Sequence, residues 1–302
     1  MNGLVNNESN SVNLQIFRLL RILHWSKNLL IFFPLFFAGK LTAFPLLMQC
    51  TLGFLFFSLT ASGVYVFNDI RDIRFDQNHP EKKLRPVAQG LISPASGLMV
   101  ASILVVMGLA GAFWTYPPFF ILLSGYVVLT LIYTFWIKNI AILDVLLLSL
   151  NYVLRIYAGG LLAGVAISPW LIVMVYLLAL LLALSKRHHD LTLSVSTDAR
   201  IRPSLNGYSP GFVKSMINYL SAVLTVCYLI YIIMGHPQTP YHQPFLILTA
   251  LPVLYGIFRY QQSIFMDQGA ADPIEYIFKD IPMLFSLIIW LLLFSISLYA
   301  AK

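Results

Sequence analysis

Long apolar segments separated by short polar connectors run along almost the whole chain. A membrane-spanning helix needs about 20 apolar residues, and by this measure the pattern predicts nine spans. They are expected at residues 17–38, 44–67, 94–113, 118–137, 142–162, 169–186, 211–234, 244–260 and 280–300. The pattern therefore predicts an all-α polytopic membrane protein, with residues 1–302 forming one transmembrane domain.

The polar tail at residues 1–16 has no basic start and no small-residue cleavage site, so we expect no removable signal peptide. Composition supports the membrane class: 59% of residues are hydrophobic and 10% are charged, whereas soluble proteins carry about 25% charged residues. Cys50 and Cys227 both fall in apolar segments and show no disulfide or metal spacing.

The net charge of +7 could indicate nucleic-acid binding, but in this class it reports orientation, and we expect no nucleic-acid partner. Basic residues gather in the connectors after the second, fourth, sixth and eighth spans, whereas WTYPPF and GHPQTPYHQP have none. The positive-inside rule then places the N-terminus and the charged connectors in the cytoplasm. We expect an integral protein of the inner (cytoplasmic) membrane.

The connector after the second span, NDIRDIRFDQNHPEKKLRPVAQG, holds the main candidate site. Asp69, Asp72 and Asp76 are spaced i, i+3 and i+7, so on a continuing helix they share one face, with Asn68 beside them. Carboxylate oxygens in such a group suit Mg²⁺, which proteins hold with few carboxylates and substrate phosphates. A solvated loop of mixed charge is the alternative, but three of only twelve acidic residues fall within eight positions.

Basic and polar residues elsewhere also lie near span ends. Five cations accompany the acidic group: Arg71, Arg74, Lys82, Lys83 and Arg85. In the first span, Arg21, His24 and Asn28 are spaced i, i+3 and i+7 with Lys27 alongside, and an interfacial anchor is the alternative reading.

The fifth span carries Asp144, Asn151 and Arg155 along one helical stripe. An ionisable group at this depth is costly, so Arg155 is a functional candidate unless it pairs with an acidic group. After the sixth span, SKRHHDL brings Lys186 and Arg187, for which helix capping is the alternative role. A cytoplasmic mouth with carboxylates and many cations indicates a diphosphate substrate, and the membrane location indicates a lipid as the second substrate.

NDIRDIRFD matches the NDxxDxxxD motif, and the chain resembles the UbiA superfamily of intramembrane prenyltransferases, which are all-helical with nine spans. The resemblance runs through HWSKNLLIFFPLFFAG, YTFWIKNIAILDV, LRIYAGG and RPSLNGYS. The HPEKKLRP continuation and the KR pair after the sixth span resemble its phosphoribosyltransferase branch. That branch implies Mg²⁺-dependent transfer of 5-phosphoribose from phosphoribosyl diphosphate to a polyprenyl phosphate.

The resemblance also implies roles for individual residues. Those that would form the Mg²⁺-diphosphate site are Asn68, Asp69, Asp72 and Asp76. Those that would contact phosphates or the cavity are Lys27, Asn28, Lys82, Lys83, Arg85, Lys138, Arg155, Lys186 and Arg187. The sequence departs from the pattern at His188, where similar proteins carry an aromatic residue followed by Glu. Asp190 keeps the acid and is expected at the substrate.

Two other functions stay open at this point. In a prenyl diphosphate:aromatic acceptor transferase the same carboxylates would bind the prenyl diphosphate, but such enzymes have a second DxxxD motif that KRHHD lacks. A lipid or solute transporter should show charged or broken segments at midplane in both halves, whereas here charge gathers at one surface. The sequence is compatible with a homo-oligomer.

Overall fold

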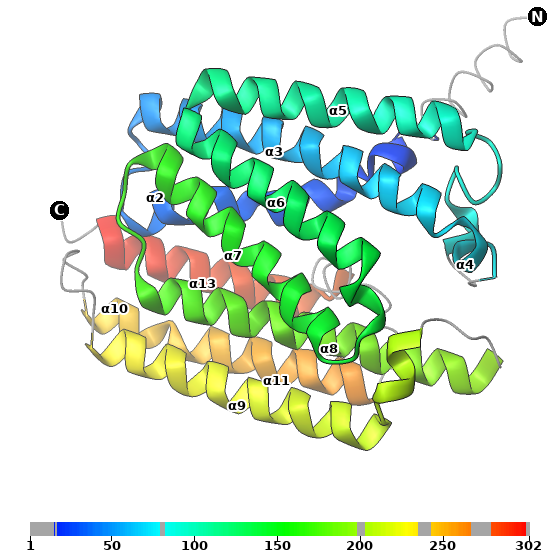
Figure 1. Cartoon of the computed structure of the whole chain (residues 1–302). Helices are drawn as coiled ribbons and strands as arrows, with labels where there is room; N and C mark the ends of the chain where they lie inside the picture. Colours follow the sequence, from blue (N-terminus) through cyan, green and yellow to red (C-terminus); the bar gives the residue numbers. More distant parts are fainter. Residues whose placement is uncertain are drawn as a thin grey trace, which may run out of the picture. The chain divides into compact units, whose positions relative to one another are not determined.

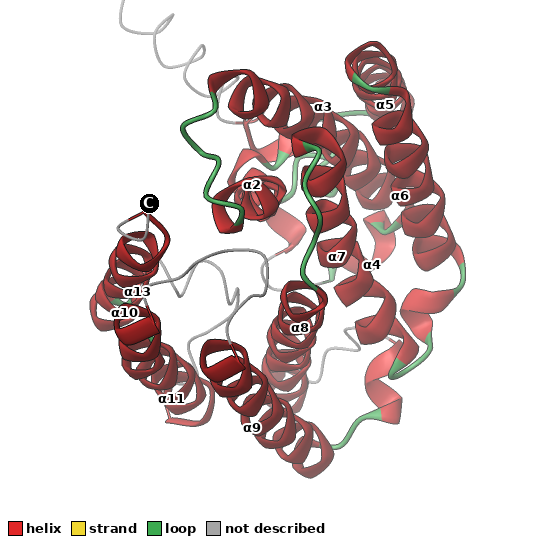
Figure 2. Ribbon diagram, turned by 90° about the vertical axis from the view of Figure 1, so that its left-hand side faces the viewer, coloured by secondary structure: helices red, strands yellow, loops and turns green. Residues whose placement is uncertain are grey.

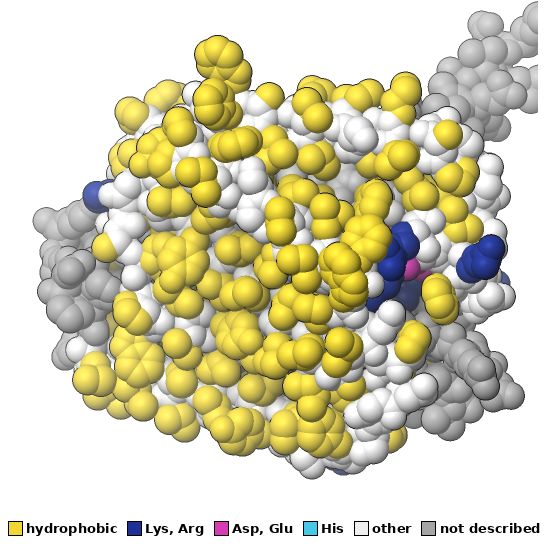
Figure 3. Space-filling model, viewed as in Figure 1, with side chains coloured by type: hydrophobic (Ala, Val, Ile, Leu, Met, Phe, Trp, Pro, Cys, Tyr) yellow, Lys and Arg dark blue, Asp and Glu magenta, His cyan; other side chains and the backbone are white. Residues whose placement is uncertain are grey.

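Every regular element in the described part of the chain is a helix (Figure 2). The computed structural model describes residues 15, 17–78, 82–197, 203–234, 243–266 and 279–299. Most of the expected polar tail at residues 1–16 lies outside these ranges. Within them, apolar side chains cover most of the surface seen in Figure 3, and most basic side chains in view gather beside an acidic group at one end.

Eight of the described helices are long and apolar enough to cross a membrane, which makes the chain an integral membrane protein and confirms the predicted class. They are Phe17–Phe37, Phe44–Arg71, Pro94–Thr115, Pro117–Phe135, Leu143–Ala163, Pro169–Leu193, Pro210–Met234 and Ile281–Tyr299. The eighth predicted span is instead divided into α10 (Gln243–Leu248) and α11 (Ala250–Met266). Pro252 explains the break, because it has no N–H to donate to the preceding turn.

The helices form two compact units, which we describe separately. The first contains η1 (Ile22–Phe32), α3 (Phe44–Arg71), α4 (Ile73–Gln77), η2 (Lys82–Leu84), α5 (Pro94–Thr115), α6 (Pro117–Phe135) and the first two residues of η3 (Ile137–Asn139). The second contains α8 (Pro169–Thr197), η4 (Pro203–Gly207), α9 (Pro210–Met234), α10, α11 and α13 (Ile281–Tyr299). Helix α2 (Phe33–Phe37) and helix α7 (Leu143–Ala163) are each shared, and α7 divides between Val153 and Leu154.

Several of these helices begin with proline, whose fixed φ suits the first turn and whose missing N–H costs nothing there. Helix α5 shows this best: Ser93 caps it by accepting a hydrogen bond from the Ser96 N–H at 3.1 Å, and Pro94 follows. Helix α3 has 28 residues and is therefore about 42 Å long, longer than the hydrocarbon core of about 30 Å. The helix is therefore longer than a perpendicular crossing needs, and its last turn carries the polar residues Asn68 and Asp69.

In the first unit α3 lies along α5 over most of its length (Figure 1). Glycine makes this close approach feasible. A Cβ on Gly108 would lie 2.1 Å from Thr60 Oγ1 and 2.7 Å from the Phe56 carbonyl oxygen, and a Cβ on Gly63 would lie 2.6 Å from the Ala101 carbonyl oxygen. Small residues at such contacts let helix backbones pack closely inside membranes.

Gly108→Ala is expected to destabilise the protein by about 1–3 kcal/mol, because the added methyl meets the α3 backbone and forces the helices apart. Gly125→Ala on α6 is the matched control, since nothing lies within 4 Å of its Cβ position. Alanine is the better helix former, so this change should be neutral or stabilising by up to about 1 kcal/mol. Thermal unfolding midpoints in detergent measure both, and equal midpoints would contradict the packing argument.

The first span differs from the expected α-helix. Residues Ile22–Phe32 form a 3₁₀ helix of 11 residues. Arg21, which directly precedes it, has a left-handed backbone conformation with φ of 51°. At three residues per turn, Trp25, Asn28 and Ile31 share a row. Trp25 Nε1 donates to Ser62 Oγ at 3.0 Å and Asn28 Nδ2 to Ser58 Oγ at 2.8 Å.

The expected grouping of Arg21, His24 and Asn28 was therefore wrong. It assumed 3.6 residues per turn, whereas in a 3₁₀ helix the residues in register with Arg21 are His24 and Lys27. The structure supports this second row: the His24 ring lies edge-on to Tyr65 with centroids 5.8 Å apart, and the Arg21 guanidinium lies 5.0 Å from the same ring.

Candidate functional site

The acidic motif lies where α3 ends and α4 begins. Asp69 is in the last turn of α3, Asp72 is the junction residue with φ −94° and ψ 8°, and Asp76 is in α4. The helix is thus interrupted at Asp72, although Asp72 N–H still donates to the Asn68 carbonyl and Asp76 N–H to the Asp72 carbonyl. All three carboxylates are buried.

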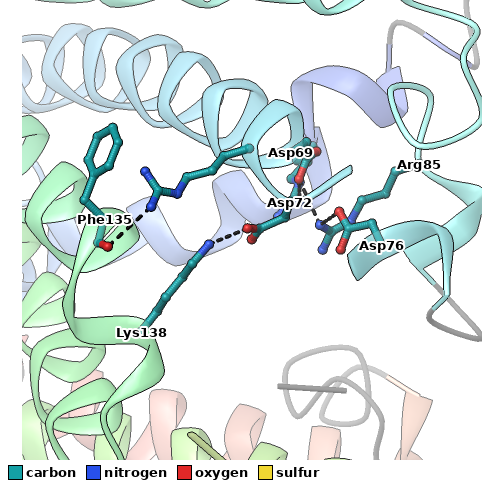
Figure 4. A network of polar contacts seen from close by, with 8 residues as sticks. Asp69, Asp72, Asp76, Arg85, Phe135 and Lys138 are labelled. Atoms are coloured by element: carbon teal, nitrogen blue, oxygen red, sulfur yellow. Dashed lines mark hydrogen bonds and ion pairs between the residues drawn. The ribbon is translucent and has the colours of Figure 1, made fainter. Parts of the chain in front are cut away.

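Each carboxylate of the motif contacts a basic side chain from elsewhere in the first unit (Figure 4). Arg85 bridges two of them: its Nη1 lies 2.9 Å from Asp69 Oδ1 and 2.6 Å from Asp76 Oδ2. Lys138, from η3, pairs through Nζ with Asp72 Oδ1, and Arg21 pairs through Nη2 with Asp69 Oδ1. We call Asp69, Asp72, Asp76, Arg21, Arg85 and Lys138 the ion-pair cluster.

Electrostatics explains why the carboxylates need these partners. The C-terminal end of α3 carries a negative partial charge, which disfavours Asp69 and Asp72. Burial raises the pKa of Asp76, and Arg85 opposes that rise by its charge and its hydrogen bond. Burial likewise lowers the pKa of Arg85, as does the positive charge of Arg21. The three cations of the cluster balance the three carboxylates, so the buried site is close to neutral.

Arg21 is a site residue that sequence reasoning missed as a contact of the motif. It was grouped with the first span, and nothing in its spacing indicates that it reaches Asp69 from 48 positions away. The left-handed backbone at Arg21 ends the preceding turn and starts η1. Tyr65, one turn before Asp69 on α3, supports the guanidinium by a cation–π contact.

A hard divalent cation fits the donor set of this site. Asn68 Oδ1 is buried and has no hydrogen-bond partner, and an orphaned buried oxygen beside three carboxylates is a suitable ligand for Mg²⁺. In the described part of the chain, no three Asp, Glu, His or Cys side chains converge in ligand geometry. In each carboxylate of the motif, one oxygen contacts a basic side chain.

The structure also describes other basic residues that were predicted to contact phosphates, Lys82, Lys83 and Lys27. Lys82 and Lys83 form η2, with Lys82 half-buried and Lys83 exposed. Lys27 is half-buried on the η1 row that also holds Arg21. The exposure of these side chains does not test the expected phosphate contacts, so the roles stay predictions.

Arg155 and Asn28 meet in the interior of the first unit. Arg155 Nε donates to Asn28 Oδ1 at 2.7 Å, and the guanidinium lies 4.8 Å from the Phe57 ring centroid and 5.3 Å from that of Tyr126. Asn28 thereby links Arg155 to Ser58 on α3. The sequence indicated Arg155 as the costly buried charge, and the structure supplies aromatic faces and an amide oxygen as part of its surroundings.

The second unit holds a separate polar network around Arg187. This guanidinium is 2% exposed; its Nε donates to Asp144 Oδ2 at 2.8 Å and its Nη1 to Asp190 Oδ2 at 2.9 Å. Tyr208 completes the network by donating to Asp144 Oδ1 at 2.6 Å and accepting from the Ile142 N–H at 2.7 Å. Burial, followed by the bond to Asp144, raises the pKa of Tyr208, which keeps the hydroxyl protonated as the donor.

This network bears on two predicted substrate contacts. Arg187 and Asp190 are buried in a mutual ion pair, while the neighbouring Lys186 is half-buried. Their assignment to substrate stays a prediction. His188, for which the sequence assigns no role, packs its ring edge-on against Phe265 at 5.7 Å.

Residues 29–279 match the UbiA prenyltransferase family. A protein of Sinorhizobium fredii, y4nM, is 36% identical over 192 residues, which are 64% of this chain and 37% of that protein. The decaprenyl-phosphate phosphoribosyltransferase of Mycobacterium tuberculosis is 28% identical over 270 residues, covering 88% of each chain. The second similarity agrees with the resemblance seen in the motifs.

Solved structures give the same fold. A UbiA homologue from Archaeoglobus fulgidus bound to GPP and Mg²⁺ superimposes with a TM-score of 0.68, covering 95% of this chain and 99% of that one at 18% identity. At this identity the likeness establishes the fold alone. It confirms the predicted all-helical membrane architecture.

Proposed function

Because the chain belongs to the UbiA prenyltransferase family and is a transferase, we propose that it transfers 5-phosphoribose from 5-phosphoribosyl 1-diphosphate to a polyprenyl (decaprenyl-like) phosphate and releases pyrophosphate. The observation that carries the proposal is the ion-pair cluster. Every carboxylate of the motif already has a basic partner. The site is therefore rich in N–H groups that can donate charge-assisted hydrogen bonds to phosphate oxygens. A donor and a lipid that both carry phosphate match this composition.

The Arg187 network supports phosphoribosyl rather than prenyl transfer to an aromatic acceptor. The latter class uses a second acidic motif after the sixth span. Here the acid at that place, Asp190, is paired with Arg187 and buried with it. One buried carboxylate that is already paired is a poor substitute for a second metal site, whereas Lys186 nearby in the sequence adds positive charge.

The reaction exchanges one C–O bond for another at ribose C1. The bond from C1 to the diphosphate oxygen breaks, and its electron pair leaves with pyrophosphate. A lipid phosphate oxygen forms the new bond to C1 through an oxocarbenium-like state. That phosphate is already ionised at neutral pH, so no side chain has to remove a proton from the nucleophile.

The residues of the first unit have distinct tasks in this scheme. Asn68, Asp69, Asp72 and Asp76 would hold Mg²⁺, which when bound neutralises charge on the departing pyrophosphate. Arg85 and Lys138 donate to its oxygens, and Lys82 and Lys83 add donors at the rim of the site. Lys27, Asn28 and Arg155 orient the phosphates or shape the cavity. In the second unit Lys186, Arg187 and Asp190 are assigned to the sugar phosphate.

We place this site at the cytoplasmic face of the inner membrane, with the N-terminus in the cytoplasm. The support comes from charge: the connector that carries the motif is basic, as the positive-inside rule requires of cytoplasmic connectors. A soluble sugar diphosphate is available on that side, and the polyprenyl chain of the acceptor stays in the bilayer.

One assay with two arms tests the function. Purified protein with Mg²⁺ receives labelled phosphoribosyl diphosphate and polyprenyl phosphate in the first arm, and prenyl diphosphate with 4-hydroxybenzoate in the second. We expect a labelled lipid in the first arm and no product in the second. Product in the second arm alone would replace the proposal by aromatic prenyl transfer. Product in neither arm would favour transport.

A further inference from the structure

We propose that Arg21, Arg85 and Lys138 act as internal counter-ions, so that a divalent cation binds the motif tightly only together with a diphosphate. The inference rests on the proposed function in one respect, that a diphosphate is the substrate. It also assigns Arg21 to the site.

The geometry shows what a metal ion alone would meet. Each of the three cations contacts a carboxylate oxygen that a metal ligand set would need: Arg21 on Asp69, Lys138 on Asp72, and Arg85 on Asp69 and Asp76. A metal ion arriving alone would bind carboxylates that each already share one oxygen with a cation, and it would lie among three positive charges. Coulomb repulsion at such distances is strong in a partly buried site.

A diphosphate removes both obstacles. It brings several negative charges, and its oxygens accept charge-assisted hydrogen bonds from Arg and Lys. The cations can then move from carboxylate to phosphate, which frees Asp69, Asp72 and Asp76 for the metal. Their side chains lie at the edge of the site rather than in the core: 14% of Arg21, 25% of Arg85 and 11% of Lys138 is exposed.

Arg21 is positioned for this exchange by the backbone and by Tyr65. The left-handed conformation at Arg21 directs the chain into η1, and the Tyr65 ring holds the guanidinium from one side. The contact with Asp69 engages Nη2, and a guanidinium has five N–H donors in a planar fork. Arg21 can therefore turn to a phosphate without losing its place on Tyr65.

Variants that lack one of these cations should show opposite changes in their affinities for diphosphate and for metal. Removing a counter-ion should weaken diphosphate binding, as for any phosphate ligand, but should strengthen metal binding in the absence of diphosphate. Arg71 is the matched control, because it is the last residue of α3 but donates to the Phe135 carbonyl, and its guanidinium lies 4.0 Å from the Phe135 ring centroid. Loss of its charge alone should not expose a carboxylate.

The experiment titrates Mn²⁺ into purified full-length protein and follows the free ion by electron paramagnetic resonance. For Lys138→Met and Arg21→Met we expect the Mn²⁺ dissociation constant to fall about tenfold or more, within the usual range of coupling between sites. Arg71→Met should stay within about threefold of wild type. Separate titrations with inorganic pyrophosphate in chelator should show weaker binding to both counter-ion variants and unchanged binding to Arg71→Met.

Two results would overturn the proposal. One is a folded Lys138→Met or Arg21→Met protein that binds Mn²⁺ no more tightly than wild type; the other is a wild type that binds Mn²⁺ equally well with and without pyrophosphate. Size-exclusion chromatography checks folding, and Lys138→Gln replaces a variant that fails it. The transfer assay can fail through the wrong sugar donor while this coupling persists, so the two failures are distinguishable.

Discussion

Asp72→Asn is expected to lower kcat/KM for phosphoribosyl transfer by about 10²–10³-fold, in the range that loss of one preorganised electrostatic group costs other enzymes. The substitution keeps the size of the side chain but removes the charge that faces Lys138 and the expected metal. Asp72 is the junction between α3 and α4, so its carboxylate lies between those of Asp69 and Asp76 along the chain.

The measurement is the initial rate of labelled phosphoribose transfer at several Mg²⁺ concentrations. Asn78→Ala is the control, because the Asn78 side chain is exposed and donates to the Arg74 carbonyl rather than to a carboxylate of the described motif. If Asp72→Asn retains a normal kcat/KM, Asp72 does not belong to the site. A loss of activity that excess Mg²⁺ restores would assign the effect to metal affinity.

Arg187→Met is expected to lower the free energy of unfolding by about 3–5 kcal/mol, the usual cost of breaking a buried ion pair by removing one partner. The change leaves Asp144 and Asp190 buried without the guanidinium that contacts both, and Asp144 is fully buried. The effect should be large because methionine fills much of the volume but neutralises neither carboxylate.

Reversible unfolding in detergent measures this prediction, with Lys186→Met as the control. Lys186 is the preceding residue on α8 and is half-buried, so we expect the change at Lys186 to alter stability by less than about 1 kcal/mol. A stable but inactive Arg187→Met protein would instead support the direct phosphate contact that the sequence predicts. The stability and the activity of one variant thus separate a structural from a substrate-binding role.

The membrane spans could be predicted closely because they depend on local composition. Uninterrupted apolar length identifies α3, α5, α6, α7, α9 and α13 with boundaries that differ by a few residues. Helix α8 continues to Thr197, past the predicted end at residue 186. The prediction stopped early because the last turns of this helix are polar and give no apolar signal. The division between α10 and α11 could have been read from Pro252, but the apolar run concealed it.

The acidic motif was equally visible, whereas its partners were not. The spacing of Asp69, Asp72 and Asp76 is local information, but their ion pairs with Arg21 and Lys138 join positions 48 and 66 residues apart. The same holds for Arg187 and Asp144, which are 43 residues apart. A single sequence supplies candidates for such pairs, and only the packing of the helices selects among them.

Because η1 is a 3₁₀ helix, its side chains return to the same face every three residues. Three residues make one turn, so inserting three would extend the helix by about 6 Å and still leave Trp25, Asn28 and Ile31 on one row. Inserting four, which nearly preserves the faces of an α-helix, would rotate everything beyond the insertion by about 120°. A triplet insertion would therefore keep the rows but shift them along the axis, whereas any other step would also turn Asn28 away from the side that faces Ser58 and Arg155.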